Sequence, residues 1–279
     1  MTVSVPARVA LCLVVLLAGC GGGTTPGDRG DATPATVTPA PVPTDERPTV
    51  REGVDGERLR RLVGRHEASL SGRSFTAVGR RVVTGPVGVL LDTRWERRVA
   101  ADRGTYHAVR SWTATWGWSG PAPVDSRHRY HAGDRTLTRF VRSGEVAYDL
   151  DSTPPTGGPL TDLDGADHLA ELLVAFETWR VVRHPNGSLR LAGRDIVQPG
   201  VLDTSGPLSD PRNATADVRI APGGRVTRVE VRFDATVDGT RVSVVEERRF
   251  VGLGSTATGR PPWYEAAIGA TASNATGTG

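Results

Sequence analysis

Residues 226–251 read VTRVEVRFDATVDGTRVSVVEERRFV, and this stretch decides the fold class of the chain. In its first half, apolar and charged residues alternate: Val229, Val231 and Phe233 with Arg228, Glu230 and Arg232. Successive side chains of a strand point to opposite faces, so one face packs on a core and the other meets water. Asp238-Gly239 follows, a pair that tolerates positive φ and favours a tight turn. These residues therefore predict a long antiparallel hairpin.

Similar strand-like segments fill most of the chain on the N-terminal side of this hairpin. They are residues 75–84, 89–101, 106–118, 127–132, 136–142, 146–150, 179–183, 189–193 and 217–220. Most are joined by short turns that contain Gly, Asp or Pro, as antiparallel neighbours require. Together with the hairpin they predict about 10 to 11 strands in one curved antiparallel sheet, a mostly β (α+β) half-barrel.

Two stretches have helical instead of alternating spacing. The first carries an apolar stripe, with arginines and His66 on its polar side, and predicts a helix of about 15 residues that stops at Gly72; the stripe is Leu59, Leu62, Val63 and Leu70. The second stripe follows a break rich in Pro, Gly and Asp, and Asp164 or Asp167 is placed to cap its helix; it is Leu169, Leu172, Leu173 and Phe176. We expect both helices to pack on the concave side of the sheet.

The N-terminus has the composition of an export signal. Arg8 is the only charged side chain before an apolar run from Val9 to Leu17. This run is about half of the roughly 20 residues that a membrane-spanning helix needs, so it is typical of a signal-peptide core. It ends in Leu17-Ala18-Gly19-Cys20, which resembles the lipobox of lipoproteins. The resemblance implies that residues 1–19 are removed and that Cys20 carries a lipid.

Residues 20–50 are rich in Thr, Pro, Ala and Gly and almost free of apolar side chains, which predicts a disordered stalk. Cys12 lies in the segment that would be removed, so the mature chain would keep only the lipid-bearing Cys20 and form no internal disulfide. The folded domain is then expected over residues 51–265, with a flexible tail of small residues at 266–279. This organisation predicts a protein that is lipid-anchored at the extracytoplasmic face of the cell membrane.

This order of elements resembles the LolA/LppX-type half-barrel, and more narrowly archaeal surface lipoproteins with a LolA-like domain. The similarity spans about residues 54–264 and is carried by the lipobox, the Thr/Pro stalk, the helix that leads into Ser74-Phe75-Thr76, and the two long hairpins before Trp263-Tyr264. The resemblance implies that the concave face holds acyl chains or another apolar ligand.

The tryptophans suggest where such a ligand would lie. Trp112, Trp116 and Trp118 share strand parity with Tyr106 and Ala108, so a straight strand would place them on one face. They fit three uses: a hydrophobic core, the wall of an apolar pocket, or a platform on which sugars stack. As candidate ligand-lining residues we take Trp112, Trp116, Phe176, Leu169, Leu172 and Leu173.

Several function classes lack support in the sequence. All 34 basic residues are Arg, and they are scattered among 31 acidic ones, which indicates solvated strand faces and argues against nucleic-acid binding. His128 and His131 should point to opposite faces of a strand, and Asp162–Asp167 has its glycine at the wrong position for an EF-hand loop, so we expect no metal. No G-x-S-x-G, Walker or H-E-x-x-H motif occurs, so we expect neither an enzyme nor a cofactor.

Asn186, Asn213 and Asn274 each begin an N-glycosylation pattern, and we expect them on a hairpin tip, in a loop and in the tail. The expected partners are the membrane, through Cys20, and an apolar small molecule or lipid; the sequence indicates no protein partner. Two other functions fit the same residues. One is a structural or adhesive module of the cell envelope without a ligand, and the other is a sugar-binding module built on the tryptophans.

Overall fold

The computed structural model describes residues 49–52, 55–115, 125–151, 163–202 and 207–276, apart from the side chains of 49–52 and 273–276. The predicted signal peptide, Cys20 and the predicted stalk as far as residue 48 lie outside these residues. Export and the lipid anchor therefore stay predictions. Among the described residues, no helix is both long and apolar enough to cross a membrane.

The described residues build one sheet of twelve strands in the order β1-β8-β9-β10-β11-β12-β2-β3-β4-β5-β6-β7, each antiparallel to its neighbours. The strands before α2 are β1 (Thr49–Glu52), β2 (Phe75–Gly85), β3 (Gly88–Val99), β4 (Thr105–Ala114), β5 (Ser126–Ala132), β6 (Arg135–Arg142) and β7 (Glu145–Asp151). Those after it are β8 (Phe176–Arg183), β9 (Leu189–Ile196), β10 (Leu208–Ile220), β11 (Val226–Val237) and β12 (Thr240–Val251). The predicted mostly β fold is confirmed.

The hairpin predicted over residues 226–251 forms as expected. Its turn joins β11 to β12 with Val237 opposite Thr240, and Asp238 and Gly239 both have positive φ. Along β11 the apolar residues of one parity are buried, among them Val231 and Phe233. The alternation therefore reports which face of the sheet carries the core.

Two strand segments were missed. β1 lies at the end of the predicted stalk and pairs with β8, Val50 opposite Val182. β10 begins at Leu208, well before the predicted residue 217, and its first half is irregular. Asp210 and Asn213 have positive φ there, and the pairing with β11 shifts register on both sides of Arg212. Such bulges favour the same residues as turns do, which is why Ser-Asp-Pro-Arg-Asn does not look like a strand.

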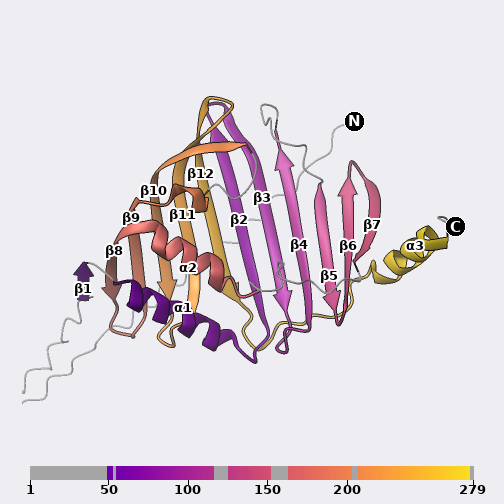
Figure 1. Ribbon diagram of the computed structural model, residues 1–279, viewed down its shortest axis with the longest axis horizontal. Coiled ribbons are helices and arrows are strands. Elements are labelled where there is room, and N and C mark those ends of the chain that lie inside the picture. The colour runs from indigo at the N-terminus through magenta and orange to yellow at the C-terminus, as the bar shows by residue number, and fades with distance from the viewer. Residues whose placement is uncertain (1–48, 53–54, 116–124, 152–162, 203–206, 277–279) are drawn as a thin grey trace, which may run out of the picture. The chain divides into compact units, whose positions relative to one another are not determined.

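Two helices lie on one face of the sheet, in front of β8 to β12 in Figure 1, and we call this the inner face. α1 (Gly56–Leu70) begins after Asp55, whose side chain accepts a hydrogen bond from the backbone nitrogen of Arg58 at 2.7 Å. α2 (Ala166–Ala175) is capped by Gly165, which has φ of 76°, and not by either predicted aspartate. Asp164 instead accepts a bond from the backbone nitrogen of Ala166 at 3.2 Å. A short 3-10 helix, η1 (Pro199–Leu202), follows β9.

The C-terminal prediction is corrected by α3 (Tyr264–Thr276), which occupies most of the tail that was expected to be flexible. Ala266, Ala267, Ala270 and Ala272 give this segment a high intrinsic helix propensity, which its small, polar appearance obscured. α3 packs near β6 and β7 (Figure 1).

The core fills the space between the two helices and the inner face of the sheet. Leu172, Leu173 and Trp179 are almost completely buried in it. His66, predicted on the polar side of α1, is instead fully buried. Its Nδ1 accepts a bond from the backbone nitrogen of Val226 at 3.2 Å, so its Nε2 donates to the carbonyl of Asp164 at 3.1 Å. The ring thus fastens α1 to both β11 and the segment before α2, and its burial lowers its pKa.

Candidate functional site

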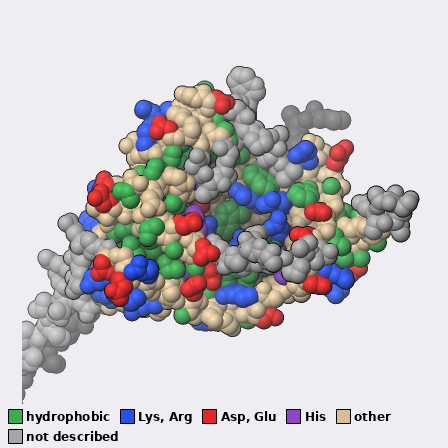
Figure 2. All heavy atoms as spheres, viewed as in Figure 1, with side chains coloured by type: hydrophobic (Ala, Val, Ile, Leu, Met, Phe, Trp, Pro, Cys, Tyr) green, Lys and Arg blue, Asp and Glu red, His purple; other side chains and the backbone are tan. Residues whose placement is uncertain are grey.

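A cavity of about 600 Å³ opens on the inner face beside α2. Cavities of this size hold small organic ligands in other proteins. Figure 2 shows the hollow with green apolar and blue basic side chains around it. Its lining is Ala77, Arg81, Thr93, Trp95, Glu96, Arg97, Tyr106, Ala108, Val109, Arg110, Arg127, Arg129, Leu163, Gly165, His168, Glu246, Arg248 and Phe250.

The register of five strands explains how these residues meet. Residues directly opposite on neighbouring antiparallel strands point to the same face, so they form rows across the sheet. One row runs from β12 to β5 through Arg248, Gly79, Trp95, Arg110 and Arg127. The next row runs through Phe250, Ala77, Arg97, Ala108 and Arg129. The cavity therefore lies over rows that mix arginines with apolar or small residues.

Part of the cavity lining is aromatic and apolar. Trp95 lies over Gly79, its partner on β2, where a Cβ would overlap the indole. The guanidinium of Arg248 lies 5.0 Å from the centre of the Trp95 ring, within the range of a cation–π contact. Tyr106 stacks on His131 with ring centroids 5.3 Å apart. Glycine at position 79 thus allows the indole to lie flat against the sheet and leaves room above it.

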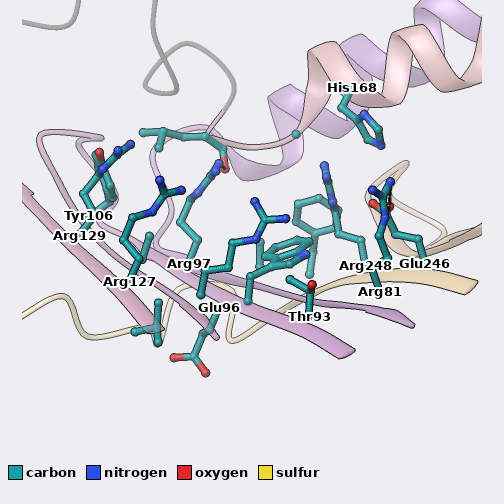
Figure 3. Close-up of a pocket in the computed structure, with 18 residues that line it drawn as sticks. Arg81, Thr93, Glu96, Arg97, Tyr106, Arg127, Arg129, His168, Glu246 and Arg248 are labelled. Atoms are coloured by element: carbon teal, nitrogen blue, oxygen red, sulfur yellow. Dashed lines mark hydrogen bonds and ion pairs between the residues drawn. The ribbon is translucent and has the colours of Figure 1, made fainter. Parts of the chain in front are cut away.

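The lining is also basic, with six arginines that stand among the apolar residues. Figure 3 shows the labelled arginines rising from the strands into the cavity, whereas the Glu96 side chain points away from them. Glu246 is the inward carboxylate and makes an ion pair with Arg81 at 2.6 Å. Burial alone would raise the pKa of Glu246, but Arg81 and Arg248 outweigh it, so the pKa lies below its ordinary value. Glu246 is therefore ionised, and the positive charges of these two arginines already balance it.

His168 borders the cavity from α2 (Figure 3). Burial, followed by the nearby charge of Arg248, lowers the pKa of His168 to about 4. The ring is therefore neutral at pH 7 and adds no positive charge to the site.

Arg110, Arg127 and Arg129 form a second basic group, which we call the arginine triad. Arg110 lies directly opposite Arg127, and Arg129 follows on the same face of β5. Burial and the neighbouring arginine both lower the pKa of Arg110 and of Arg127. Within the described residues, no carboxylate forms an ion pair with the triad, and the Nε atoms of Arg110 and Arg129 are buried without a hydrogen-bond partner. Three partly desolvated cations thus share one patch.

Trp112, the first predicted lining residue, lies on the inner face with the predicted parity, opposite Thr93. It is not among the lining residues but is half-buried in the same row as two of them, Arg81 and Thr93, and the Arg110 and Arg127 guanidinium carbons lie 5.2 and 6.0 Å from its ring. Trp116, and its neighbour Trp118, lie outside the described residues. The predicted opposite orientation of His128 and His131 agrees with their contacts, since His131 stacks on Tyr106 and His128 faces His107 and Trp263.

The stripe predicted on a helix over Leu169–Phe176 belongs mainly to the core, and its last residue is not helical, because Phe176 begins β8. Leu173 and Phe176 are buried, and Phe176 meets Trp179 edge to face with ring centroids 5.4 Å apart. Leu169 and Leu172 border a second cavity of about 10 Å³, which has room for one water molecule at most. The stripe therefore covers the half of the sheet next to the main cavity, and whether any of these residues contacts a ligand stays a prediction.

The three predicted glycosylation sites have different surroundings. Asn186 is exposed at the turn between β8 and β9, as expected. Asn213 is exposed but lies in the bulged part of β10 and not in a loop, and its Nδ2, the atom that a glycan would use, donates to Asp234 at 2.8 Å. Asn274 lies in α3 and not in an unstructured tail.

The arginines of the cavity were missed because each was interpreted alone as a solvated charge. The signal was available in the parity of the strands. Arg110 shares parity with Tyr106, Ala108 and Trp112, which the sequence analysis placed on one face. An arginine that shares strand parity with core residues is expected to point its charge towards the inner face of the sheet.

Comparison with solved structures adds a likeness in fold. No protein-family model matches the chain, and no curated protein matches it in sequence. A solved structure, that of the LolA superfamily protein NE2245 from Nitrosomonas europaea, matches 75% of this chain and 96% of its own with 9% identity and a TM-score of 0.27. A TM-score this low leaves function to be argued from the residues of the chain itself.

Proposed function

We propose that the chain is a lipid-anchored extracytoplasmic protein that binds a lipid-like small molecule on the inner face of its sheet. The observation that carries this proposal is the cavity of about 600 Å³, whose lining combines apolar and aromatic side chains with six arginines. A molecule with an apolar part and an anionic or polar part matches this lining, whereas a purely apolar one would leave the arginines desolvated. The lipobox and the stalk would hold this cavity outside the membrane.

The anchor is tested by mass spectrometry of the mature protein. Cys20 should be its first residue and carry lipid, and Cys20→Ser should release the domain or leave the precursor uncut. A mature N-terminus beyond Cys20 without lipid would contradict the anchoring part of the proposal and leave the cavity unaffected.

The ligand is tested on residues 45–279, which form one compact unit that contains the described core. Native mass spectrometry of this unit should detect a co-purifying amphiphile, and a fluorescent fatty acid should bind and be displaced by added lipid. If no lipid is found and no probe binds, the structural or adhesive module becomes the better interpretation.

A further inference from the structure

The arginines of the sheet differ in how they are neutralised. On the face opposite the inner face, which we call the outer face, strand arginines pair with carboxylates; the pairs include Arg80 and Arg94 with Asp92, Arg98 with Glu96, Arg190 and Arg219 with Asp217, Arg228 and Arg232 with Glu230, and Arg249 with Glu247. On the inner face, Arg81 has Glu246. The arginine triad has no such partner among the described residues, although it is more buried than outer-face arginines such as Arg80, Arg94 and Arg98.

This difference has an energetic meaning. A charge taken out of water costs free energy unless an opposite charge replaces the solvent. Like charges directly opposite on neighbouring strands, as Arg110 and Arg127 are, are unfavourable as well. On the outer face, opposite arginines such as Arg80 and Arg94 share a carboxylate, whereas in the described part of the cavity lining Arg110 and Arg127 do not. Such an arrangement is expected where an anion from outside the chain completes the site.

We infer that the arginine triad binds the phosphate group of the ligand, so that the proposed lipid-like molecule is a phosphate-bearing amphiphile. This inference rests on the proposed function for the apolar part of the ligand and on the triad alone for the anion. Guanidinium groups present a planar fork of N–H donors that matches phosphate oxygens two at a time. Arg110 and Arg129 each also hold a buried Nε without a hydrogen-bond partner among the described residues, so the chain itself does not satisfy their donors.

The geometry also gives the orientation of the ligand. The triad lies on β4 and β5, whereas Trp95, Ala77 and Phe250 lie on β3, β2 and β12. The phosphate would lie over β4 and β5, and the chains would extend over Trp95 towards α2. Leu163 and His168, at and before the start of α2, border the cavity on that side, and His168 is neutral at pH 7.

The test is calorimetric titration of residues 45–279 with three probes: dihexanoyl phosphatidic acid, dihexanoyl phosphatidylcholine and inorganic phosphate. The two lipids share their chains, so their comparison isolates the net charge and access of the phosphate. We expect phosphatidic acid to bind at least tenfold more tightly than phosphatidylcholine, and inorganic phosphate to bind more weakly than phosphatidic acid. Raising the salt concentration should weaken the binding of phosphatidic acid most.

Variants assign the effect to the triad. Arg127→Gln and Arg129→Gln should each weaken phosphatidic acid binding by about tenfold or more, the usual loss for a hydrogen bond to a charged group. Arg127→Lys should lose less, because it keeps the charge but not the fork. The matched control is Arg94→Gln, which removes one charge from the outer face of β3, where Arg94 pairs with Asp92. It should bind all three probes as the unchanged chain does, and thermal melts should show each variant folded.

The outcomes separate this inference from the proposed function. Equal binding of both lipids, unaffected by the triad variants, would overturn the inference and leave a lipid-binding protein. Inorganic phosphate binding as tightly as phosphatidic acid, with the same loss in Arg127→Gln, would support the anion site and contradict the lipid-like ligand. Failure of all three probes to bind would overturn both.

Discussion

The same pair of residues occurs in two regions of the inner face and serves two different purposes. Trp179 on β8 lies opposite Gly193 on β9, and Trp95 on β3 lies opposite Gly79 on β2. In each pair the glycine leaves space for an indole that lies across the neighbouring strand, since a Cβ on Gly193 would come within 2.8 Å of the Trp179 ring and one on Gly79 would overlap Trp95. Both pairs therefore pack a tryptophan over a glycine of the neighbouring strand.

What differs is the layer above each indole. Trp179 lies beneath α2, is 2% exposed, and donates from Nε1 to the carbonyl of Leu173 at 2.9 Å. Trp95 is half-buried and has the Arg248 guanidinium and the cavity above it. The sheet thus supplies similar surfaces in both regions, and the cover provided by the helices decides which surface becomes core and which lines a cavity.

Truncation of the two tryptophans should produce the largest difference between the regions. Trp179→Ala should lower the free energy of unfolding by about 3–5 kcal/mol, because it leaves a cavity in a closed core and an unpaired carbonyl on Leu173. Trp95→Ala should cost clearly less, about 1–2 kcal/mol, since part of the ring is already exposed. Urea denaturation of residues 45–279 measures both, and equal losses would show that Trp95 is core as well.

His168, on α2 between the core and the cavity, should make the free energy of unfolding depend on pH. The pKa of His168 is about 4 in the folded chain against an ordinary value of 6.5, so between these values the unfolded chain binds a proton that the folded chain does not. Stability due to this group is therefore complete above about pH 6.5 and falls as the pH approaches 4, by about 3 kcal/mol in total. His66, His107, His128 and His131 act in the same direction, because burial also lowers their pKa.

The measurement is urea unfolding at pH 7 and at pH 4 for the unchanged chain, for His168→Gln, and for His184→Gln at the β8–β9 turn. His168→Gln should lose about 3 kcal/mol less on acidification, and His184→Gln should behave as the unchanged chain. The same loss in all three would mean that His168 is solvated.

The glycines allow a finer comparison. Gly193→Ala should cost about 1–3 kcal/mol, because Trp179 is held by α2 and cannot move away. Gly79→Ala should cost only about 1 kcal/mol, because Trp95 can tilt into the cavity, and this movement should change its fluorescence and weaken ligand binding. If Gly79→Ala is the more destabilising of the two, the space above Trp95 is not available to it.

The smallest expected effect is a gain in stability. Arg127→Leu should stabilise the ligand-free domain by about 1 kcal/mol, because it removes a desolvated charge opposite Arg110. Arg94→Leu, on the outer face, should be neutral or slightly destabilising because it breaks an exposed ion pair with Asp92. Thermal melts in phosphate-free buffer distinguish the two, and destabilisation by Arg127→Leu would mean that this arginine has a structural partner.

The sequence predicted the parts of the fold that depend on local pattern. Alternation and turn residues located most strands, and helical spacing located α1 and α2, because these signals lie within a few residues of each other. It failed at β10, where bulges at Asp210 and Asn213 resemble turns, and at α3, whose alanines have propensity but no amphipathic stripe. The cavity could not be predicted from the sequence for another reason. The triad meets through the pairing of β4 with β5, and the rows continue to β12, more than a hundred residues further along the chain.

The open ends of the twelve-stranded sheet bear on how the protein behaves among its own copies. An unclosed sheet has two edge strands whose free backbone groups can recruit a strand from another molecule. Here one edge, β1, has only four residues, and the other, β7, carries Glu145, Asp149 and Asp151 and has α3 packed near it. Two β7 edges brought together would set carboxylate against carboxylate. At high concentration such domains would therefore be kept apart at this edge by mutual repulsion.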